Sequence, residues 1–343
     1  MSATESLEVI PSHIYCRPGS KADHALHRRQ GRQVSAPSPE ATAGGFGLHQ
    51  ELDLIDRGGK VIPDLTYKTF YVGGAAAWNV SDISNIDRSL AAIMTDTGLN
   101  NVIVQYLRGD PVGTNPKPSS VLPDPAAASI SQDDLEEFVK TLQLQGKLDG
   151  FPLDSTVFNF MLPSGTQLTL GESPAQRKHA TYSEVAPGNA AGIPVDDEDS
   201  SLDGLGGFHG SVHVSVPDSD PLTIYYAVGV FSEILADGRE NGIVVFPDSW
   251  KNVVATFYHE LCEARTDPDV GDAIRNNDSA FVGWSSSDGS EIGDIPMNLV
   301  GSQLSKVIRE ITLGNGETAP LQFQWSNFVH SPEGRAASPH PPA

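Results

Sequence analysis

The sequence predicts an α/β protein, with helices packed on a mixed β-sheet, from three observations. Between residues 66 and 107 a strand-like run, an amphipathic helix and a second strand-like run follow one another, which is the order of a βαβ unit. Residues 206–216 and 222–231 alternate in hydrophobicity around the turn PDSDP, which is typical of a β-hairpin. From Trp250 to Leu261, apolar side chains recur every three to four positions, as in a helix with one buried face.

The other elements follow from local patterns in chain order. A strand is predicted at 66–74, a helix at 83–95, a strand at 101–107 and, after a Pro-rich loop, a helix capped by Ser131. A strand at 155–162 precedes the hairpin, and a helix over 297–311 and a closing strand over 321–329 end the domain. Residues 1–60 and 331–343 show no sustained period, so we expect disordered tails around a single α/β domain, 61–330.

Composition argues against several classes of partner. The chain has 343 residues, with 22 Lys plus Arg against 44 Asp plus Glu, a formal charge of −22. Such a surface repels nucleic acid and anionic membranes and favours cations. No apolar run reaches the roughly 20 residues of a transmembrane helix, and no secretory signal is recognisable, so we expect a soluble, cytoplasmic protein. The two cysteines, Cys16 and Cys262, imply no disulfide framework.

The helix predicted around residues 250–261, with Asp248 or Ser249 as its N-cap and a stop set by Pro268, carries the strongest chemical signal, the motif HELCE. At 100° per residue, His259 and Glu263 lie one turn apart and nearly opposite the apolar stripe, with Glu260 at the flank. Zinc peptidases hold their metal on H-E-x-x-H, and a carboxylate in place of the second histidine still suits zinc, manganese or ferrous iron. Without a metal, His259 and Glu263 would be a polar helix face joined by an i,i+4 contact.

A further ligand is expected from the chain that follows this helix. Glu291 and Asp294, in the run GWSSSDGSEIGD, are spaced so that one could bind the ion and the other orient it. Otherwise they are surface acids beside a hairpin turn at 288–289. Asp269 is a poorer candidate, because Thr266 replaces the glycine that the corresponding turn of zinc peptidases needs.

Two histidines upstream share one face of the predicted hairpin. His209 lies between glycines at the start of a strand, and His213 points to the same side four residues later. Either is a ligand, a substrate contact or a hydrogen-bonded structural histidine.

The combined motifs resemble a known family. HELCEARTDP, then GW at 283–284 and EIGD at 291–294, is similar to a pattern of the exordium-like, phosphate-induced proteins and their bacterial relatives. The run at 67–79, QY at 105–106, the glycine-flanked His209 and WSN at 325–327 agree, so the resemblance covers roughly 60–330. Members are generally exported, and some relatives are labelled peptidase-like. The chain departs from the pattern in lacking a signal and in having Ile295 where a cysteine often follows the aspartate. The resemblance implies one site formed by His259, Glu260, Glu263, Glu291 and Asp294.

We therefore expect a metal-dependent, peptidase-like hydrolase with a zincin-like arrangement of the helix. Zinc, with manganese as an alternative, would be bound by His259, Glu263 and either Glu291 or Asp294. Glu260 would take the proton from the attacking water, and His209 would stabilise the oxyanion. The substrate would be a peptide or protein. The alternative is a non-catalytic exordium-like binding or signalling domain, in which the same residues form a structural polar network or a structural metal site.

Overall fold

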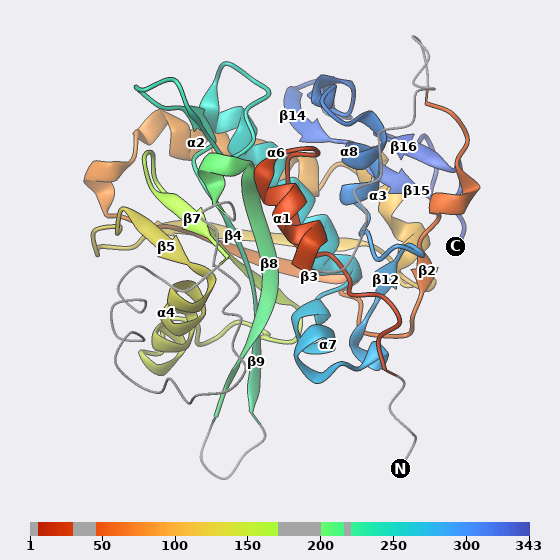
Figure 1. The fold of residues 1–343 in the computed structure, drawn as a ribbon, viewed down its shortest axis with the longest axis horizontal. Helices are drawn as coiled ribbons and strands as arrows, with labels where there is room; N and C mark the ends of the chain where they lie inside the picture. The colour runs from red at the N-terminus through yellow and green to blue at the C-terminus, as the bar shows by residue number, and fades with distance from the viewer. Residues whose placement is uncertain (1–5, 30–45, 171–199, 216–220) are drawn as a thin grey trace, which may run out of the picture.

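A six-stranded mixed sheet forms the centre of the molecule (Figure 1). The structure is a computed structural model that describes residues 6–29, 46–170, 200–215 and 221–343. The four strands β9, β6, β3 and β4 run parallel to one another. β8 is antiparallel to β9, and β1 is antiparallel to β8. The mixed α/β fold predicted from the sequence is thus confirmed. In spatial order the strands are β1 (Ile14–Cys16), β8 (Leu205–Val214), β9 (Leu222–Gly229), β6 (Thr156–Met161), β3 (Asp64–Tyr71) and β4 (Gly113–Val121).

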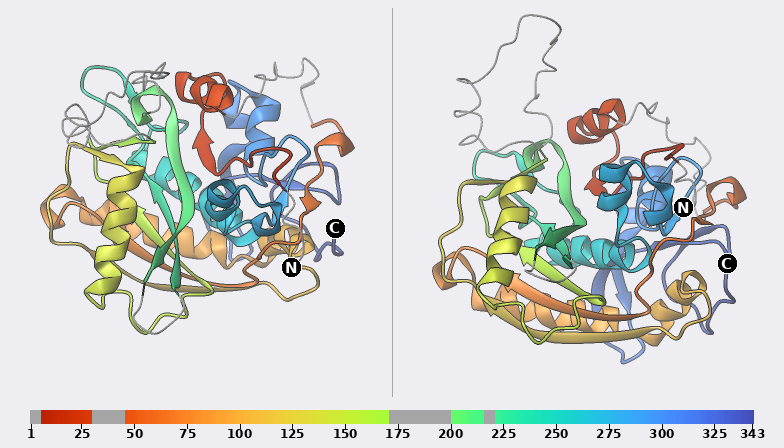
Figure 2. Two further views of the ribbon diagram at one scale, coloured as in Figure 1. Left: turned by 60° about the horizontal axis from the view of Figure 1, so that its bottom comes forward. Right: turned by 90° about the horizontal axis from the view of Figure 1, so that it is seen from below.

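The two faces of this sheet pack against different helices. Val157 and Met161 of β6 contribute to a core with α6 (Ser249–Thr266) and α2 (Val80–Met94). Phe158 and Phe160, which alternate with them, contribute to a second core with α4 (Gln132–Leu144). Both views in Figure 2 show α4 and α6 on opposite sides of the green strands β8 and β9.

The helix starts follow local signals in the sequence. The Asn79 side chain accepts a hydrogen bond from the Ser81 N–H at the start of α2, and Ser131 forms a capping box with Asp134 at the start of α4. α6 begins at the predicted boundary, although the Asp248 side chain makes no capping hydrogen bond there. Two short helices follow it, α7 (Val270–Asn276) and α8 (Asp294–Val300).

The strand predicted at 101–107 is wrong, because this segment is helical. It continues α3 (Thr97–Ile103) into a 3₁₀ turn at Val104–Tyr106. The Asp96 carboxylate accepts a hydrogen bond from the Leu99 N–H at 3.0 Å, and this cap outweighs the β-branched run. The strand parallel to β3 is instead β4, in the predicted Pro-rich loop. Its prolines are tolerated because β4 is an edge strand.

The end of the domain also differs from the prediction. The expected helix over 297–311 is replaced by α8, a 3₁₀ turn at Leu304–Lys306 and β13 (Ile308–Thr312). β13 pairs with β14 (Thr318–Gln322), and the predicted closing strand is divided between β14 and β15 (Gln324–Ser326). Two further two-stranded sheets are β5 (Ser129–Ser131) with β7 (Gln167–Thr169) and β10 (Glu233–Ile234) with β11 (Glu240–Asn241).

The predicted tails are structured wherever the structure describes them. β1 is followed by α1 (Lys21–Arg29), and β2 (Ile55–Asp56) pairs with β12 (Trp284–Ser285). At the other end, β16 (Ser331–Glu333) pairs with β15, and the Ala343 N–H donates to the Gln105 carbonyl at 2.9 Å. Composition suggested disorder because these segments lack a pattern of their own, but contacts with the domain hold them in place. Residues 1–5 and 30–45 lie outside the described residues. Within the described ranges, no helix is long and apolar enough to cross a membrane.

Candidate metal centre

Helix α6 is buried on both sides. The predicted apolar stripe, which includes Val253 and Phe257, packs into the core as expected. The opposite side is not solvated, because His259, Glu260 and Glu263 are each 0 % exposed. β8 with its neighbour β1, β14 and the segment before α8 cover this side of the helix. The polar face of the motif therefore lies in the interior of the protein.

The closest contact between a histidine and a carboxyl group in this interior joins the two outer residues of the motif. His259 Nε2 lies 3.0 Å from Glu263 Oε2, and both atoms are buried without a hydrogen-bond partner. Burial lowers the pKa of His259 to about 4, so the ring is neutral and carries one proton. Its Nδ1 lies 3.2 Å from Gln322 Oε1, an acceptor, which places that proton on Nδ1. The lone pair of Nε2 therefore faces a carboxyl oxygen, and a positive species, either a proton or a metal ion, is needed between them.

A loop before α8 fixes the other end of this contact. The Gly293 N–H donates to Glu263 Oε1 at 3.2 Å, and the Gln322 side-chain amide donates to the Gly293 carbonyl at 2.6 Å. A Cβ on Gly293 would lie 2.3 Å from His259 Nδ1, so only glycine permits this approach. The same loop brings Asp294 Oδ1 to 4.0 Å from His259 Nε2. The predicted EIGD segment thus reaches the predicted helix.

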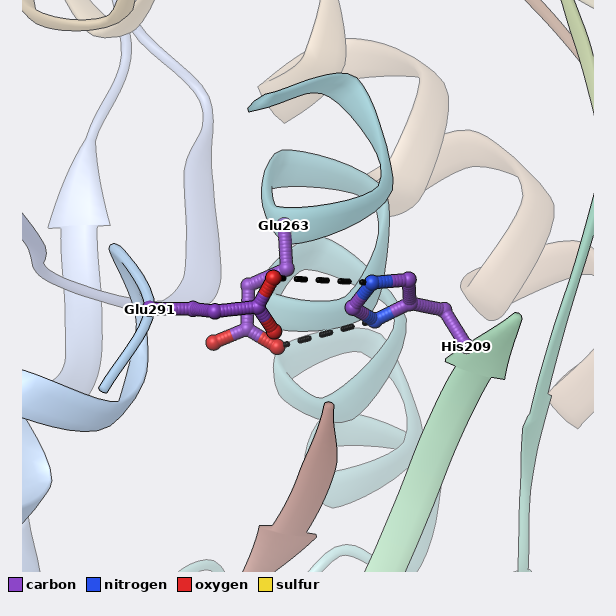
Figure 3. A group of neighbouring side chains, drawn as sticks. All are labelled: His209, Glu263 and Glu291. Atoms are coloured by element: carbon purple, nitrogen blue, oxygen red, sulfur yellow. Dashed lines mark ion pairs between the residues drawn. The ribbon is translucent and has the colours of Figure 1, made fainter. Parts of the chain in front are cut away.

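His209 lies on β8 between carboxyl groups from two other elements (Figure 3). Its Nδ1 is 3.3 Å from Glu260 Oε2 and 3.8 Å from Glu263 Oε2. Its Nε2 is 3.2 Å from the Asp267 carbonyl oxygen and 3.8 Å from Glu291 Oε1. Both ring nitrogens therefore face protein oxygens, and His209 is a member of the cluster itself.

The centre concentrates acidic groups in a buried volume. Burial raises the pKa of Glu260, Glu263 and Glu291 well above the usual glutamate range, and repulsion between the neighbouring carboxyls raises it further for Glu260 and Glu291. Among the described residues, none of the three forms an ion pair with a Lys or Arg side chain. Glu260 Oε1 and both oxygens of Glu291 also have no hydrogen-bond partner. Bound protons or a cation must compensate these groups.

Two groups of ligand atoms in this cluster could hold a metal ion. One consists of His259, Glu263 and Asp294, and the other of His209, Glu263 and Glu291. Within each group the ligand atoms lie within 4.8 Å of one another, and the groups share Glu263. Five of the six residues singled out from the sequence are therefore brought together, and the sixth, Glu260, lies beside them.

Sequence reasoning missed four residues at the centre. Gln322 binds His259 from β14, and the Asp267 carbonyl contacts His209 just after α6. Tyr15 and His13 come from the segment expected to be a tail, and their rings lie 4.0 Å from His259 and 6.3 Å from His209, centre to centre. The two glycines at 206–207, which leave room beside β8, were the only available signal.

Several alternative candidates lie elsewhere. His213 hydrogen-bonds to Asp272 at 2.8 Å, away from the motif. Asp269 faces Lys60 and Tyr225. Burial raises the pKa of Cys262 to about 12, so its thiol is unreactive. Trp78, Trp284 and Trp325 are all buried in the core, so they offer no exposed aromatic surface on which a carbohydrate could stack.

Comparison of the chain with protein-family models, with curated proteins and with solved structures finds no match. The resemblance to exordium-like proteins therefore remains a prediction from the motifs.

Proposed function

We propose that the protein is a metal-dependent, peptidase-like hydrolase whose ion binds to His259, Glu263 and Asp294. The observation that carries this proposal is the pair of unpartnered atoms His259 Nε2 and Glu263 Oε2, 3.0 Å apart in the protein interior. The Gln322 contact to His259 Nδ1 supports it, because metal-binding histidines are usually held through the other ring nitrogen in this way. One imidazole and two carboxylates suit zinc, and manganese is the alternative.

When bound, the ion would lower the pKa of water and polarise a carbonyl group. Glu260 is the proposed general base. Its Oε1 has no hydrogen-bond partner, so it is available to take the proton from the attacking water and pass it to the leaving amine as the C–N bond breaks. His209 contacts the other oxygen of Glu260 at 3.3 Å, and we assign it the role of positioning this base. The oxyanion role expected from the sequence would require a His209 N–H to leave the Asp267 carbonyl.

The test combines metal content with hydrolysis. The purified full-length chain, prepared without chelator, should contain about one zinc or manganese ion, and His259→Ala should contain none. Glu260→Gln should keep the ion and lose about 10²–10⁴-fold in the hydrolysis of a peptide library, because it lacks only the base. A Glu260→Gln chain as active as the wild type would contradict the assignment of the base.

The burial of His209, His259, Glu260, Glu263 and Glu291 favours a second candidate, a non-catalytic domain with a structural metal or polar network. A structural zinc site is closed, with four protein ligands, whereas a catalytic site keeps one position for water. Replacing zinc by cobalt and adding azide separates the two cases. A visible spectrum that changes with azide indicates an open position, and an unchanged spectrum supports the structural alternative.

A further inference from the structure

An extended segment of the N-terminal region lies directly on the metal centre. β1 pairs antiparallel with β8 at the edge of the main sheet, with Ile14 opposite Phe208 and Tyr15 opposite Gly207. Main-chain hydrogen bonds extend this pairing on both sides. The His209 N–H donates to the His13 carbonyl at 3.4 Å, and the Arg17 N–H donates to the Gly204 carbonyl at 2.8 Å. Backbone pairing of this kind accepts many sequences, which is how sheet edges bind peptides.

A second attachment holds the segment from its other side. The Ser12 N–H donates to the Gly289 carbonyl at 2.8 Å, in the turn just before Glu291. The extended backbone of residues 12–17 therefore lies between β8 and the loop that carries the acidic ligands. Both of these walls belong to the proposed active site.

The side chains of this segment cover the residues of the proposed chemistry. The Tyr15 ring lies 4.0 Å from the His259 ring, and Tyr15 is 1 % exposed.

The strand opposite is shaped for these contacts. A Cβ on Gly206 would lie 2.4 Å from the Tyr15 ring, and a Cβ on Gly207 would lie 2.4 Å from the Val228 carbonyl and 3.0 Å from Glu260. The absence of a Cβ at Gly206 therefore makes room for the Tyr15 ring, and the absence of a Cβ at Gly207 makes room for Glu260, the proposed base.

We propose that the edge of β8 is the binding site for an extended peptide substrate, and that residues 12–16 occupy it in the structure. This inference rests on the proposed function, since it names the substrate class of the same centre. A peptide would pair antiparallel with β8 and place an aromatic side chain where Tyr15 lies over His259. Release of the chain's own segment would open the centre, in which His209, His259 and the three glutamates are otherwise buried.

The first experiment measures competition between this segment and the same sequence added in trans. The probe is a fluorescein-labelled peptide of residues 10–19, IPSHIYCRPG, with serine in place of its cysteine, and binding is followed by fluorescence anisotropy in chelator so that no hydrolysis occurs. The full-length Tyr15→Ala chain should bind it at least tenfold more tightly than the wild type, because its own segment competes less well. A scrambled peptide and a peptide with alanine in place of tyrosine should bind at least tenfold more weakly. Equal binding of the native and scrambled peptides overturns the inference.

The second experiment does not depend on the Tyr15→Ala chain being folded. Cys16 lies opposite Leu205 in the register, and Cys16 and Cys262 are not in a disulfide. In a Cys16→Ser/Leu205→Cys chain, a peptide of residues 10–19 that keeps its cysteine should form a mixed disulfide in a thiol redox buffer, detected by mass spectrometry. The rate should be at least tenfold that of a scrambled peptide with the same cysteine, and Cys16→Ser alone should not react. Equal rates for the two peptides would overturn the proposal.

These outcomes are separable from those of the proposed function. If the purified chain contains no metal but still traps the native peptide selectively, the peptide-binding site is supported and the proposed hydrolase function is contradicted. If the metal-loaded chain hydrolyses small esters but does not trap the native peptide selectively, the hydrolase function is supported and the peptide-binding site is contradicted.

Discussion

Strand β8 carries two carboxylate–histidine clusters on the same face, and they are balanced in opposite ways. At the open end of the strand, His213 and Arg275 both contact Asp272 Oδ1 at 2.8 Å, and the side chains of His213 and Arg275 are each 42 % exposed. At the buried end, His209 and His259 meet glutamates that form no ion pair with Lys or Arg in the described part of the chain. Arg275 balances the charge of the first cluster, whereas no Lys or Arg side chain of the described ranges does so in the second. The same residue types therefore form a structural ion-pair network at one site, whereas at the other their buried negative charge requires a proton or a bound cation.

The largest expected difference between the clusters is their response to metal. Zinc at 100 times its dissociation constant should stabilise the wild-type chain by about 2.7 kcal/mol relative to the chelated chain. His213→Ala should retain this difference, because its ring lies in the cluster that Arg275 already balances. His259→Ala should lose it. Thermal unfolding with zinc and with chelator measures all three chains. An equal loss in His213→Ala and His259→Ala would place the ion outside the proposed centre.

A glycine in each cluster gives a matched comparison of packing. Gly293→Ala puts a methyl group 2.3 Å from His259 Nδ1, so it should weaken zinc binding at least tenfold and lower the free energy of unfolding by about 1–3 kcal/mol. In Gly271→Ala, the nearest atom is Arg275 Nη1 at 3.2 Å, at the end of a flexible side chain. Because alanine also favours the helical backbone of α7, this variant should stay within about 1 kcal/mol of the wild type and bind zinc normally. Zinc titration by calorimetry and urea unfolding check both. If Gly293→Ala bound zinc as tightly as the wild type, the position of the His259 ring beside Gly293 would not be required for zinc binding.

Much of the buried cluster was predictable because its residues lie on one helix turn and one short loop. His259 and Glu263 are one turn apart on α6, and Glu291 lies three residues before Asp294, the first residue of α8. Gln322 was not predictable, because its contact with His259 spans 63 residues and depends on the pairing of β13 with β14. Burial was missed for a related reason. The apolar stripe of α6 indicated one packed side, and the other side is covered by β8 with β1, by β14 and by the segment before α8, all of which are distant in the sequence or follow the helix.

The smallest expected effects are the opposite pH dependences of the two clusters in the chelated protein. Burial raises the pKa of Asp267 from 3.8 to about 8, so the unfolded chain ionises first and the folded state loses stability as the pH rises from about 4 to 8. Burial also acts to raise the pKa of Asp272, but hydrogen bonds from His213 and Arg275 outweigh it and hold that pKa below 3.8. The stability contributed by Asp272 is therefore fully present above pH 4 and is lost as the pH falls through its lowered pKa.

Two asparagine variants isolate these contributions. Asp267→Asn should gain stability relative to the wild type between pH 4 and 8, since asparagine does not ionise. Asp272→Asn should be less stable than the wild type by about 1–2 kcal/mol at pH 7 and should approach it below pH 4. Urea unfolding of the three chelated chains at half-unit steps of pH measures both differences. If Asp267→Asn were instead less stable than the wild type at pH 7, as expected for Asp272→Asn, a permanent positive charge would have to balance the buried cluster as Arg275 balances the open one. The centre would then not need a metal ion.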